Sequence, residues 1–407
     1  MIARDVSEAL ARVRAAGEVL RARPADQVLD TLAAAVDRLA DPGSAIRKGL
    51  EDELPEATGF SPETVREGLT RALGAWSGDA LRDLVERELG RDAFQGRGPR
   101  PAGGFPTTAT ILAGALPMPT LLDLLAPLVL RSPVLAKTSQ HDPITAVRFR
   151  RDLANLDPEL GAAVEIVAFP SDDADCVAAL LEADCVLVTG SDATVRAVSA
   201  RVAPPRRLVT HGHKLSIAAV GPDAEPDVAE RIARDVALWD QLGCLSPMAV
   251  YAVGGAELAE ALADALAEAE ARCPRGRVPA EAANAAVSEA DQARMRGARV
   301  WADTAGRFTV VRETDTHWRP APLHRFVRVH PVPDIASLVD ALRPLGPFLA
   351  GAALEGFGPA TRELSLACAG LGASRICAPG RIQEPPLSWC RGNRGVLAPL
   401  ARFTDSA

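Results

Sequence analysis

The hydrophobic pattern changes once along the chain, near residue 100. Residues 1–95 carry apolar positions three and four apart, interrupted at Asp41-Pro42-Gly43 and Ser61-Pro62, the pattern of amphipathic helices and their breaks. From Gly103 onward, short apolar runs alternate with helical patterns of about ten to fifteen residues, as in β-α-β units. We therefore expect a helical layer at 1–95 and a parallel α/β sheet at 96–242.

Six apolar runs are the predicted strands of this first sheet. Their apolarity is continuous rather than alternating, which favours strands buried on both faces with helices above and below. The runs are residues 108–113, 133–137, 164–169, 186–189, 207–210 and 215–220.

A second α/β lobe is predicted at residues 243–379, after a helix at 227–240 and a short loop. The remaining residues, 380–407, are rich in Gly, Pro and Arg and indicate an extended C-terminal tail. The elements predicted within the second lobe are a helix at 256–272 and strands at 248–253, 308–311 and 326–329.

Charge and composition exclude several classes of function. The chain of 407 residues has a formal net charge of −8 and no basic run with interleaved aromatic residues, so we expect no nucleic-acid partner. The N-terminus has charges in every turn, unlike a signal peptide. The apolar stretch 111–130 contains three prolines and Asp123, so we expect buried protein rather than a membrane span, and a cytoplasmic location.

The cysteines and histidines do not form the usual paired motifs. Seven cysteines include no Cys-x-x-Cys pair, and six histidines are scattered. We therefore expect neither a disulfide framework nor a metal centre.

Cys244 is the candidate nucleophile. A free cysteine is most often a small buried apolar residue, and Cys185, inside an apolar run, fits that interpretation. Cys244 instead follows Gly243 in a turn between a predicted helix and strand, at the join of the two lobes. Ligands tend to bind at such joins, and an activated thiolate can carry an acyl group.

An ordered series of short motifs resembles the aldehyde dehydrogenase superfamily, and more closely its acyl-CoA reductase branch, the LuxC-type fatty-acid reductases. The resemblance covers about residues 100–405, and its closing segment is 380–389. The motifs are Ile111-Leu112-Ala113-Gly114-Ala115-Leu116-Pro117, Ser132-Pro133-Val134-Leu135-Ala136-Lys137-Thr138-Ser139, Val188-Thr189-Gly190-Ser191, Gly212-His213-Lys214 and Gly243-Cys244.

This resemblance implies an α/β protein with two Rossmann-like lobes, one binding a cofactor and one catalytic. It implies NADPH-dependent reduction of an acyl-CoA or acyl-carrier thioester to an aldehyde through an S-acyl intermediate on Cys244. The expected partners are that thioester, an acyl-protein synthetase or carrier protein, and a second copy of the chain in a homo-oligomer. We also expected a nearby helix end to lower the pKa of the Cys244 thiol.

The cofactor residues implied by the resemblance lie in two of the motifs. Lys137 matches the lysine that reaches the cofactor's ribose or adenylate phosphate, and Ser139 and Gln140 follow it. Gln140 is neutral where relatives that prefer NAD often carry a carboxylate, which favours NADPH, with NADH as the alternative. Gly190 and Ser191 form a turn that can offer backbone donors to the pyrophosphate.

Two positions depart from the family's pattern. Thr210 stands where hydrolytic aldehyde dehydrogenases have a glutamate that activates water, and the neighbouring His211 and His213 are candidates for proton transfer or for a structural role. Ala115 stands where the family usually has an asparagine that binds the oxyanion. The first departure favours a thioester reductase over an NAD-dependent aldehyde or semialdehyde dehydrogenase. The second favours a catalytically silent paralogue that acts as a binding subunit.

Overall fold

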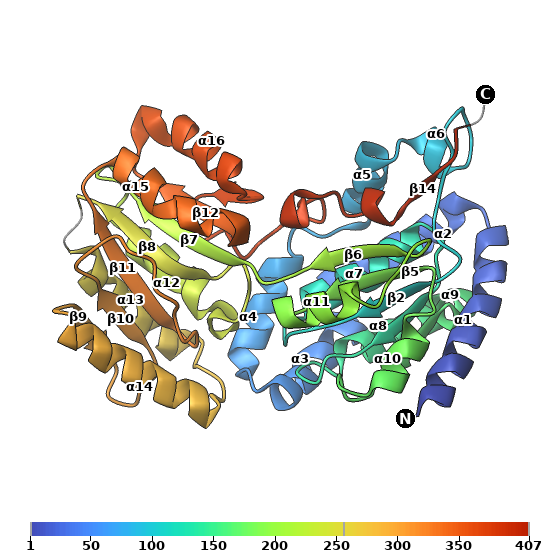
Figure 1. Ribbon diagram of the computed structural model, residues 1–407, viewed down its shortest axis with the longest axis horizontal. Coiled ribbons are helices and arrows are strands. Elements are labelled where there is room, and N and C mark those ends of the chain that lie inside the picture. Colours follow the sequence, from blue (N-terminus) through green and yellow to red (C-terminus); the bar gives the residue numbers. More distant parts are fainter. Residues whose placement is uncertain (1, 255–256, 406–407) are drawn as a thin grey trace.

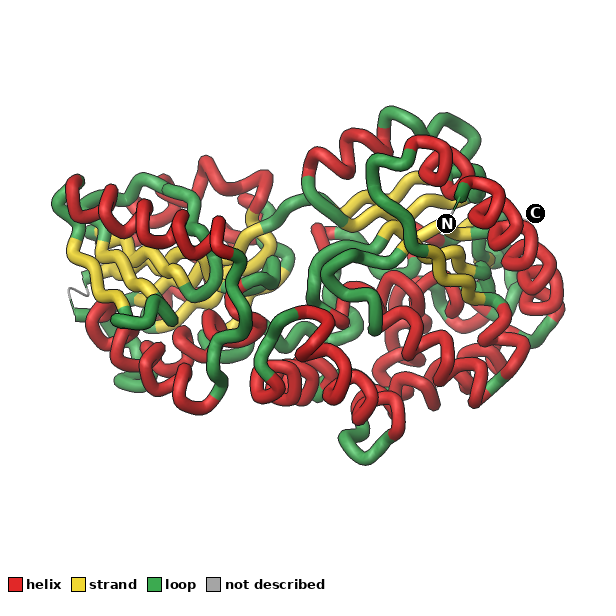
Figure 2. The backbone as a smooth tube through the Cα atoms, turned by 90° about the horizontal axis from the view of Figure 1, so that it is seen from below, coloured by secondary structure: helices red, strands yellow, loops and turns green. Residues whose placement is uncertain are grey.

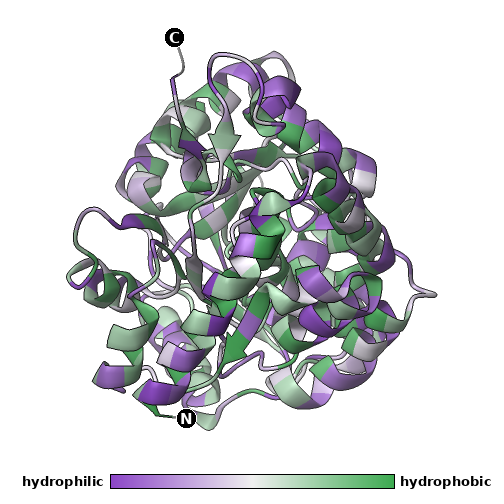
Figure 3. Cartoon of the chain, turned by 90° about the vertical axis from the view of Figure 1, so that its right-hand side faces the viewer, coloured by the Kyte–Doolittle hydropathy of each residue, from purple (hydrophilic) through white to green (hydrophobic). Residues whose placement is uncertain are grey.

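The computed structural model describes residues 2–254 and 257–405 and divides them into two lobes, each built around its own β-sheet (Figure 1). In the view of Figure 2, helices flank both sheets, and a narrow connection joins the lobes. Helices on the surface carry hydrophobic and hydrophilic residues in turn along their length (Figure 3), as amphipathic helices do. The α/β class predicted from the sequence is confirmed.

The first ninety-five residues form helices, as predicted, although they do not form one layer. α1 packs with α10 on one face of the first sheet, whereas α2 to α5 join α7 and α8 on the other face. Ser44, Ser61 and Ser77 cap the N-termini of α3, α4 and α5 through their side-chain oxygens, a favourable arrangement. The helices are α1 (Ala3–Ala22), α2 (Ala25–Ala40), α3 (Ala45–Thr58), α4 (Pro62–Leu73), α5 (Gly78–Glu88) and α6 (Arg91–Phe94).

The first sheet has five parallel strands in the order β4-β3-β2-β5-β6. Successive side chains of β5 enter opposite cores: Val186 and Val188 enter the core with α1, and Cys185 and Leu187 enter the other. The strands are therefore buried on both faces, as predicted. The strands and helices are β2 (Thr108–Ile111), α7 (Pro117–Val129), β3 (Val134–Lys137), α8 (Thr145–Leu156), α9 (Pro158–Ala162), β4 (Val164–Val167), α10 (Ala174–Leu180), β5 (Cys185–Thr189), α11 (Asp192–Ser199) and β6 (Arg207–His211).

The second sheet has seven strands in the order β13-β12-β7-β8-β11-β10-β9, all parallel except β9, which runs antiparallel to β10. α12 and α13 cover one face, and α15 and α16 cover the other. The elements are β7 (Leu215–Val220), α12 (Val228–Ala237), β8 (Pro247–Val253), α13 (Leu258–Arg272), α14 (Ala280–Met295), β9 (Arg299–Ala302), β10 (Thr309–Arg312), β11 (Phe326–Val332), α15 (Ile335–Leu342), β12 (Leu349–Glu355), α16 (Thr361–Leu371) and β13 (Arg375–Cys377).

One predicted strand belongs to the other lobe. The sequence assigned 215–220 to the first sheet, whereas β7 lies between β12 and β8 in the second. The chain therefore crosses between the sheets at residues 212–214 rather than at 243. A strand's apolar pattern records that it is buried but not which strands flank it, so the pattern could not give this assignment.

The C-terminal tail returns from the second lobe to the first (Figure 1). Its last described strand, β14 (Arg402–Phe403), pairs antiparallel with β1 (Ala102–Gly103) of the same chain. Short 3-10 turns at Arg391–Asn393 and Ala398–Leu400 interrupt it. The tail thus connects the two lobes of one chain. The predicted homo-oligomer is a separate matter and stays a prediction.

The described residues include neither a membrane-spanning helix nor a metal-binding cluster. None of the helices there combines the length and apolarity needed to cross a membrane. No group of His, Cys, Asp and Glu residues in the described part of the chain could hold a metal ion.

A buried carboxyl group anchors the start of the tail and leads to a prediction. Asp235 of α12 accepts the Gly380 N–H at 2.6 Å, and burial raises the pKa of this carboxyl to about 7. An unfolded Asp titrates near 3.9, so the folded state retains this proton between about pH 4 and pH 7. The group therefore stabilises the fold in acid, and that contribution is lost as the pH rises through about 7.

Asp235→Asn should remove this pH dependence, because a neutral amide oxygen can still accept the Gly380 N–H. We expect the variant to be more stable than the wild type at pH 8, by at most about 3–4 kcal/mol. Thermal unfolding at pH 5 and pH 8 measures the effect, and Asp264→Asn on the exposed face of α13 is the control. Equal pH dependence in the wild type and Asp235→Asn would contradict the assignment.

Candidate active site

The loop that carries Cys244 begins with a strained turn. Trp239, Asp240 and Gln241 have φ of 56°, 48° and 65°, a left-handed conformation that non-glycine residues adopt at a cost of about 1–3 kcal/mol each. Trp239 is fully buried and packs edge-on against Phe60, with ring centroids 5.3 Å apart. A Cβ at Gly68 of α4 would overlap the indole, so only glycine allows this approach.

Buried polar groups hold the same turn from the second lobe. Asp240 pairs with Arg325 at 2.7 Å, and both side chains are nearly inaccessible to solvent. The Gln241 side chain donates to the carbonyls of Pro247 and Phe326 and accepts the Phe326 N–H, each at 2.9 Å. Buried polar groups with every partner in place define one geometry, so the turn has a fixed direction.

The tail holds the other end of the loop. The Gln383 amide donates to Ser246 Oγ at 2.6 Å and to the Asp235 carbonyl at 3.0 Å. Ser216 of β7 donates its hydroxyl to the Cys244 carbonyl at 2.8 Å. Cys244 is therefore presented by a loop that α12, β7 and the tail all hold.

Two cavities meet at Cys244. The larger is a cleft of about 600 Å³ between the carboxyl edge of the first sheet and the amino edge of the second. Ligands of parallel α/β sheets usually bind at carboxyl edges. Its lining includes Gly190 and Ser191 after β5, Thr210 and His211 at the end of β6, and His213, Lys214, Met248, Leu323, Ala350, Arg391 and Arg394.

The smaller cavity is an apolar pocket of about 70 Å³ on the other side of the thiol. Six residues line both cavities and mark their junction: Leu116, Pro119, Gly243, Cys244, Trp389 and Arg391. A reacting group on Cys244 therefore has an apolar side and a polar side.

The cleft is cationic. Among the described residues that line it are Lys214, Arg391 and Arg394, and none of those lining residues is Asp or Glu. Arg391 is fixed by the buried carboxylate of Asp123 in α7, 3.0 Å away, and by Thr189 Oγ1 at 3.3 Å. Thr189 in turn donates its hydroxyl to Asp123 at 2.7 Å. The tail thus places a rigid positive charge at the junction of the two cavities.

The expected lowering of the Cys244 pKa is not found. Burial raises the pKa of the thiol, while Arg391 and then Lys214 oppose that effect by favouring the thiolate. Desolvation penalises a charged sulfur more than these two cations stabilise it. Among the groups that favour the thiolate, Arg391 has the largest effect on the pKa, followed by the Cys244 backbone N–H and Lys214.

The two histidines have different environments. Burial, followed by the charges of Arg391 and Arg394, lowers the pKa of His211 to about 3, so His211 is neutral near pH 7 and cannot act there as a cationic acid. His213 is exposed, and its backbone N–H donates to Asp192. Both line the cleft.

The predicted cofactor residues fall into two places. Gly190 and Ser191 line the cleft, although the Gly190 N–H already donates to the His211 carbonyl. Lys137 is buried outside the cleft lining, where Nζ donates to Ser171 Oγ at 3.1 Å, and burial lowers its pKa. Ser139 accepts the His141 N–H, and Gln140 is exposed. Lys137, Ser139 and Gln140 thus lie at the end of β3, and Gly190 and Ser191 lie at the end of β5. Both ends are on the carboxyl edge of the first sheet, where β2 lies between the two strands.

Ala115 is buried, and it is not among the residues that line the cleft, whereas Gly114 and Leu116 are. Its methyl packs in the core that α2 to α5 share with α7. The position supplies no polar group to Cys244.

Asp123, Arg391 and Trp76 were not predicted as site residues. Asp123 interrupts an apolar stretch, and a buried carboxylate requires a cationic partner, so the sequence carried a signal for Asp123 but did not identify Arg391. Trp76 reaches the apolar pocket from the turn between α4 and α5. Nothing in the local pattern distinguished it from a core tryptophan.

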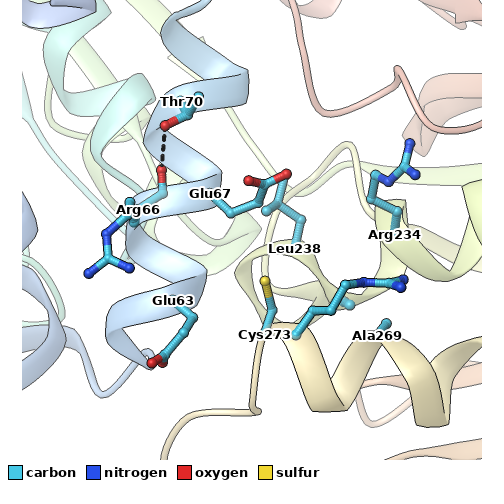
Figure 4. A pocket seen from close by; sticks show the side chains of 10 residues that line it. Glu63, Arg66, Glu67, Thr70, Arg234, Leu238, Ala269 and Cys273 are labelled. Carbon is cyan, nitrogen blue, oxygen red and sulfur yellow. Dashed lines mark hydrogen bonds between the residues drawn. The ribbon is translucent and has the colours of Figure 1, made fainter. Parts of the chain in front are cut away.

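Another cavity, of about 360 Å³, lies between α4 and the helices α12 and α13 (Figure 4). Glu67 and Cys273 face the gap, whereas Arg66 points away from it. It shares no lining residue with the cleft or the apolar pocket. Its mixed charges on an open surface indicate no particular ligand.

The two-lobed fold with a cysteine loop between the lobes is that of aldehyde dehydrogenases. Solved structures support this class. The NAD-dependent benzaldehyde dehydrogenase of Corynebacterium glutamicum matches 99% of this chain and 90% of its own, with a TM-score of 0.78 and 15% identity. The betaine aldehyde dehydrogenase of Staphylococcus aureus matches 100% and 88%, with a TM-score of 0.75 and 14% identity.

Within that class, the chain belongs to the acyl-CoA reductase (LuxC) family, whose model matches residues 20–389. The long-chain acyl-protein thioester reductase of Aliivibrio fischeri is 26% identical over 217 residues, 50% of this chain and 45% of the relative. That of Vibrio harveyi is 24% identical over 208 residues, 48% and 44%. The matched segments thus span less than half of each relative.

The position of Arg391 predicts the reactivity of the thiol. Arg391→Gln should raise the Cys244 pKa further and slow its alkylation by iodoacetamide at pH 7.5 severalfold, because a smaller fraction of the thiol is then ionised. The pH dependence of alkylation, followed by mass spectrometry of the Cys244 peptide, measures this change. Arg394→Gln is the control, because Arg394 lines the same cleft but is not among the charges that shift Cys244. Equal slowing in both variants would contradict a specific role for Arg391.

Proposed function

We propose that this protein reduces an acyl thioester to an aldehyde with NADPH, through a thioester on Cys244. One observation carries the proposal: Cys244 lies where an apolar pocket meets a cationic cleft without a lining carboxylate. The pocket suits the acyl group, and the cleft suits phosphate-bearing groups. Both are needed by an enzyme that binds an apolar acyl chain together with an anionic carrier and an anionic cofactor.

In the first half-reaction, the Cys244 thiolate attacks the thioester carbonyl, the bond between the carbonyl carbon and the carrier sulfur breaks, and the carrier leaves as a thiolate that takes up the proton lost by Cys244. The Cys244 backbone N–H is one of the two groups that we assign to the tetrahedral oxyanion. Ala115 cannot supply the second donor, and removal of one such donor typically costs about a hundred- to thousandfold in rate. The guanidinium of Arg391 is the group we assign to that role, since it is charged, fixed by Asp123 and adjacent to both cavities.

The nicotinamide cofactor supplies hydride for the second half-reaction when it is bound. Ser191, which caps α11, and Lys214 are cleft residues suited to its phosphates. Lys137 ends β3, Ser139 and Gln140 follow it, and the three would hold the adenosine end. An uncharged Gln140 does not repel a 2′-phosphate, which supports NADPH over NADH. A fold shared with an NAD-dependent dehydrogenase supports the cofactor class.

The cleft also disfavours hydrolysis of the acyl-enzyme. Thr210 lines it where a water-activating glutamate would stand, and a threonine hydroxyl is no base near neutral pH. His211 is neutral and only partly exposed, so its role is structural or that of a proton acceptor. These features disfavour the alternative of an NAD-dependent aldehyde or semialdehyde dehydrogenase.

The substrate follows from the family and from charge. We infer an acyl-CoA or an acyl-carrier thioester, because both present phosphates to Lys214, Arg391 and Arg394. The relatives are named acyl-protein thioester reductases, which supports an acyl-protein synthetase or carrier as the partner. A silent binding subunit would retain these surfaces without turnover.

Removal of the nucleophile is the direct test. Cys244→Ala should abolish both the acyl adduct and the oxidation of NADPH by acyl-CoA, because the thiolate forms the covalent bond. Intact-protein mass spectrometry and absorbance at the NADPH band measure the two steps. Cys185→Ala, in the core of the first sheet, should retain both. A full adduct on Cys244→Ala would refute the assignment, and no turnover in the wild type would favour the silent subunit.

A second test concerns cofactor choice. Gln140→Glu should weaken NADPH more than NADH, since a carboxylate beside a 2′-phosphate adds repulsion of about one to a few kcal/mol. Fluorescence titration of each cofactor measures the two dissociation constants. Gln95→Glu, remote from β3, controls for the added charge. An equal change for both cofactors would contradict the placement of Gln140 at the adenosine ribose.

A further inference from the structure

The apolar pocket beside Cys244 is lined by parts of the chain that are far apart in sequence. Beyond the six junction residues, its walls come from α4 and the turn after it, from α7, and from the loop after Cys244 and the tail. These walls are Ala72, Trp76, Met118, Leu122, Leu245, Gln383, Pro385, Pro386 and Leu387. Apart from the Gln383 amide, which is engaged with Ser246 and Asp235, these side chains are apolar. The pocket therefore suits a hydrocarbon that extends from the thiol.

The pocket is short. A buried water needs about 10–15 Å³ of such volume, so 70 Å³ holds about five to seven atoms of water or methylene size. A linear acyl group of about six carbons fills it. A fatty acyl chain of twice that length would extend beyond these walls.

Trp76 lines the pocket on the side of the helical region. It is 5% exposed, and its indole N–H donates to the Pro385 carbonyl of the tail at 3.4 Å. Among the described wall residues beyond the junction, it is the only aromatic one. Arg71 of α4 also pairs with Glu384 of the tail at 2.7 Å. The indole is thus held between α4 and the tail. A flexible side chain at this position could move aside, whereas the indole is held in place.

We propose that Trp76 limits the acyl substrate of this protein to short chains of about six carbons. This limit rests on the proposed function, because it assigns the pocket to the acyl group. The matched relatives are named for long-chain acyl groups. The chain-length limit belongs to this chain's own walls: Trp76, Met118 and the tail residues Pro385 to Leu387.

A binding series tests the pocket without turnover. Linear carboxylates from butanoate to dodecanoate are measured by their protection of Cys244 from iodoacetamide. In the wild type, affinity should rise about fourfold for each methylene buried and stop rising near six carbons. Trp76→Ala should extend the rise by at least three carbons, because a methyl replaces the indole. Continued fourfold steps to dodecanoate in the wild type would overturn the limit.

Two further variants keep the test interpretable. Trp76→Leu retains apolar bulk and should extend the series less than Trp76→Ala, so it serves if the alanine variant does not fold. Trp301→Ala, in β9 at the edge of the second sheet, removes a tryptophan elsewhere and should leave the series unchanged. The same break point in Trp76→Leu as in the wild type would overturn the role of Trp76.

Reduction of acyl-CoAs from acetyl to palmitoyl separates this inference from the proposed function. Fastest reduction near hexanoyl-CoA, with at least tenfold slower reduction of palmitoyl-CoA, supports both. If affinity stops rising near six carbons in the binding series but no acyl-CoA is reduced, the proposed function is contradicted and the pocket limit is supported. Reduction of palmitoyl-CoA as fast as hexanoyl-CoA sinks the limit alone.

Discussion

The structure of the site depends on one strained turn. Trp239, Asp240 and Gln241 are all left-handed, which costs several kcal/mol in total. The turn persists because three different parts of the protein hold it: the Trp239 indole fits over Gly68, Asp240 pairs with Arg325, and Gln241 bonds β8 and β11. Its direction decides where Cys244 stands between the two sheets, so the cleft and the apolar pocket both exist because of it.

The tail is the second constraint, because it makes one unit of two lobes. Gln383 bonds Ser246 beyond the thiol, and Arg391 pairs with Asp123 in the first lobe. Of the residues between them, Trp389 lines both cavities, and Pro385, Pro386 and Leu387 line the apolar pocket. The extended, Pro-rich composition of the tail suggests a peripheral segment. The tail instead supplies pocket walls and a positive charge to the site, and it anchors the loop that carries Cys244.

The chemistry follows from an opposition between burial and charge at the thiol. Burial disfavours the thiolate, and Arg391 and Lys214 favour it. The same burial suits an acyl group on the apolar side, and the same cations suit an anionic carrier on the polar side. In the function proposed above, Thr210 in place of a carboxylate base would leave an acyl-cysteine without a residue that activates water.

The sequence by itself determined the α/β class, the helices before residue 95, most strands of the first sheet and the prominence of Cys244, because period and turn chemistry are local. It could not place β7 in the second sheet, and it missed β9, β12 and β13, of which β12 reads as the small-residue run Leu349–Glu355. Tertiary structure alone decided that Arg391 meets Asp123, 268 residues earlier in the chain, and that Trp76 reaches the tail. The physical reason is that hydrophobic pattern specifies how deeply a residue is buried, whereas its partners are chosen by chain closure and packing over long separations.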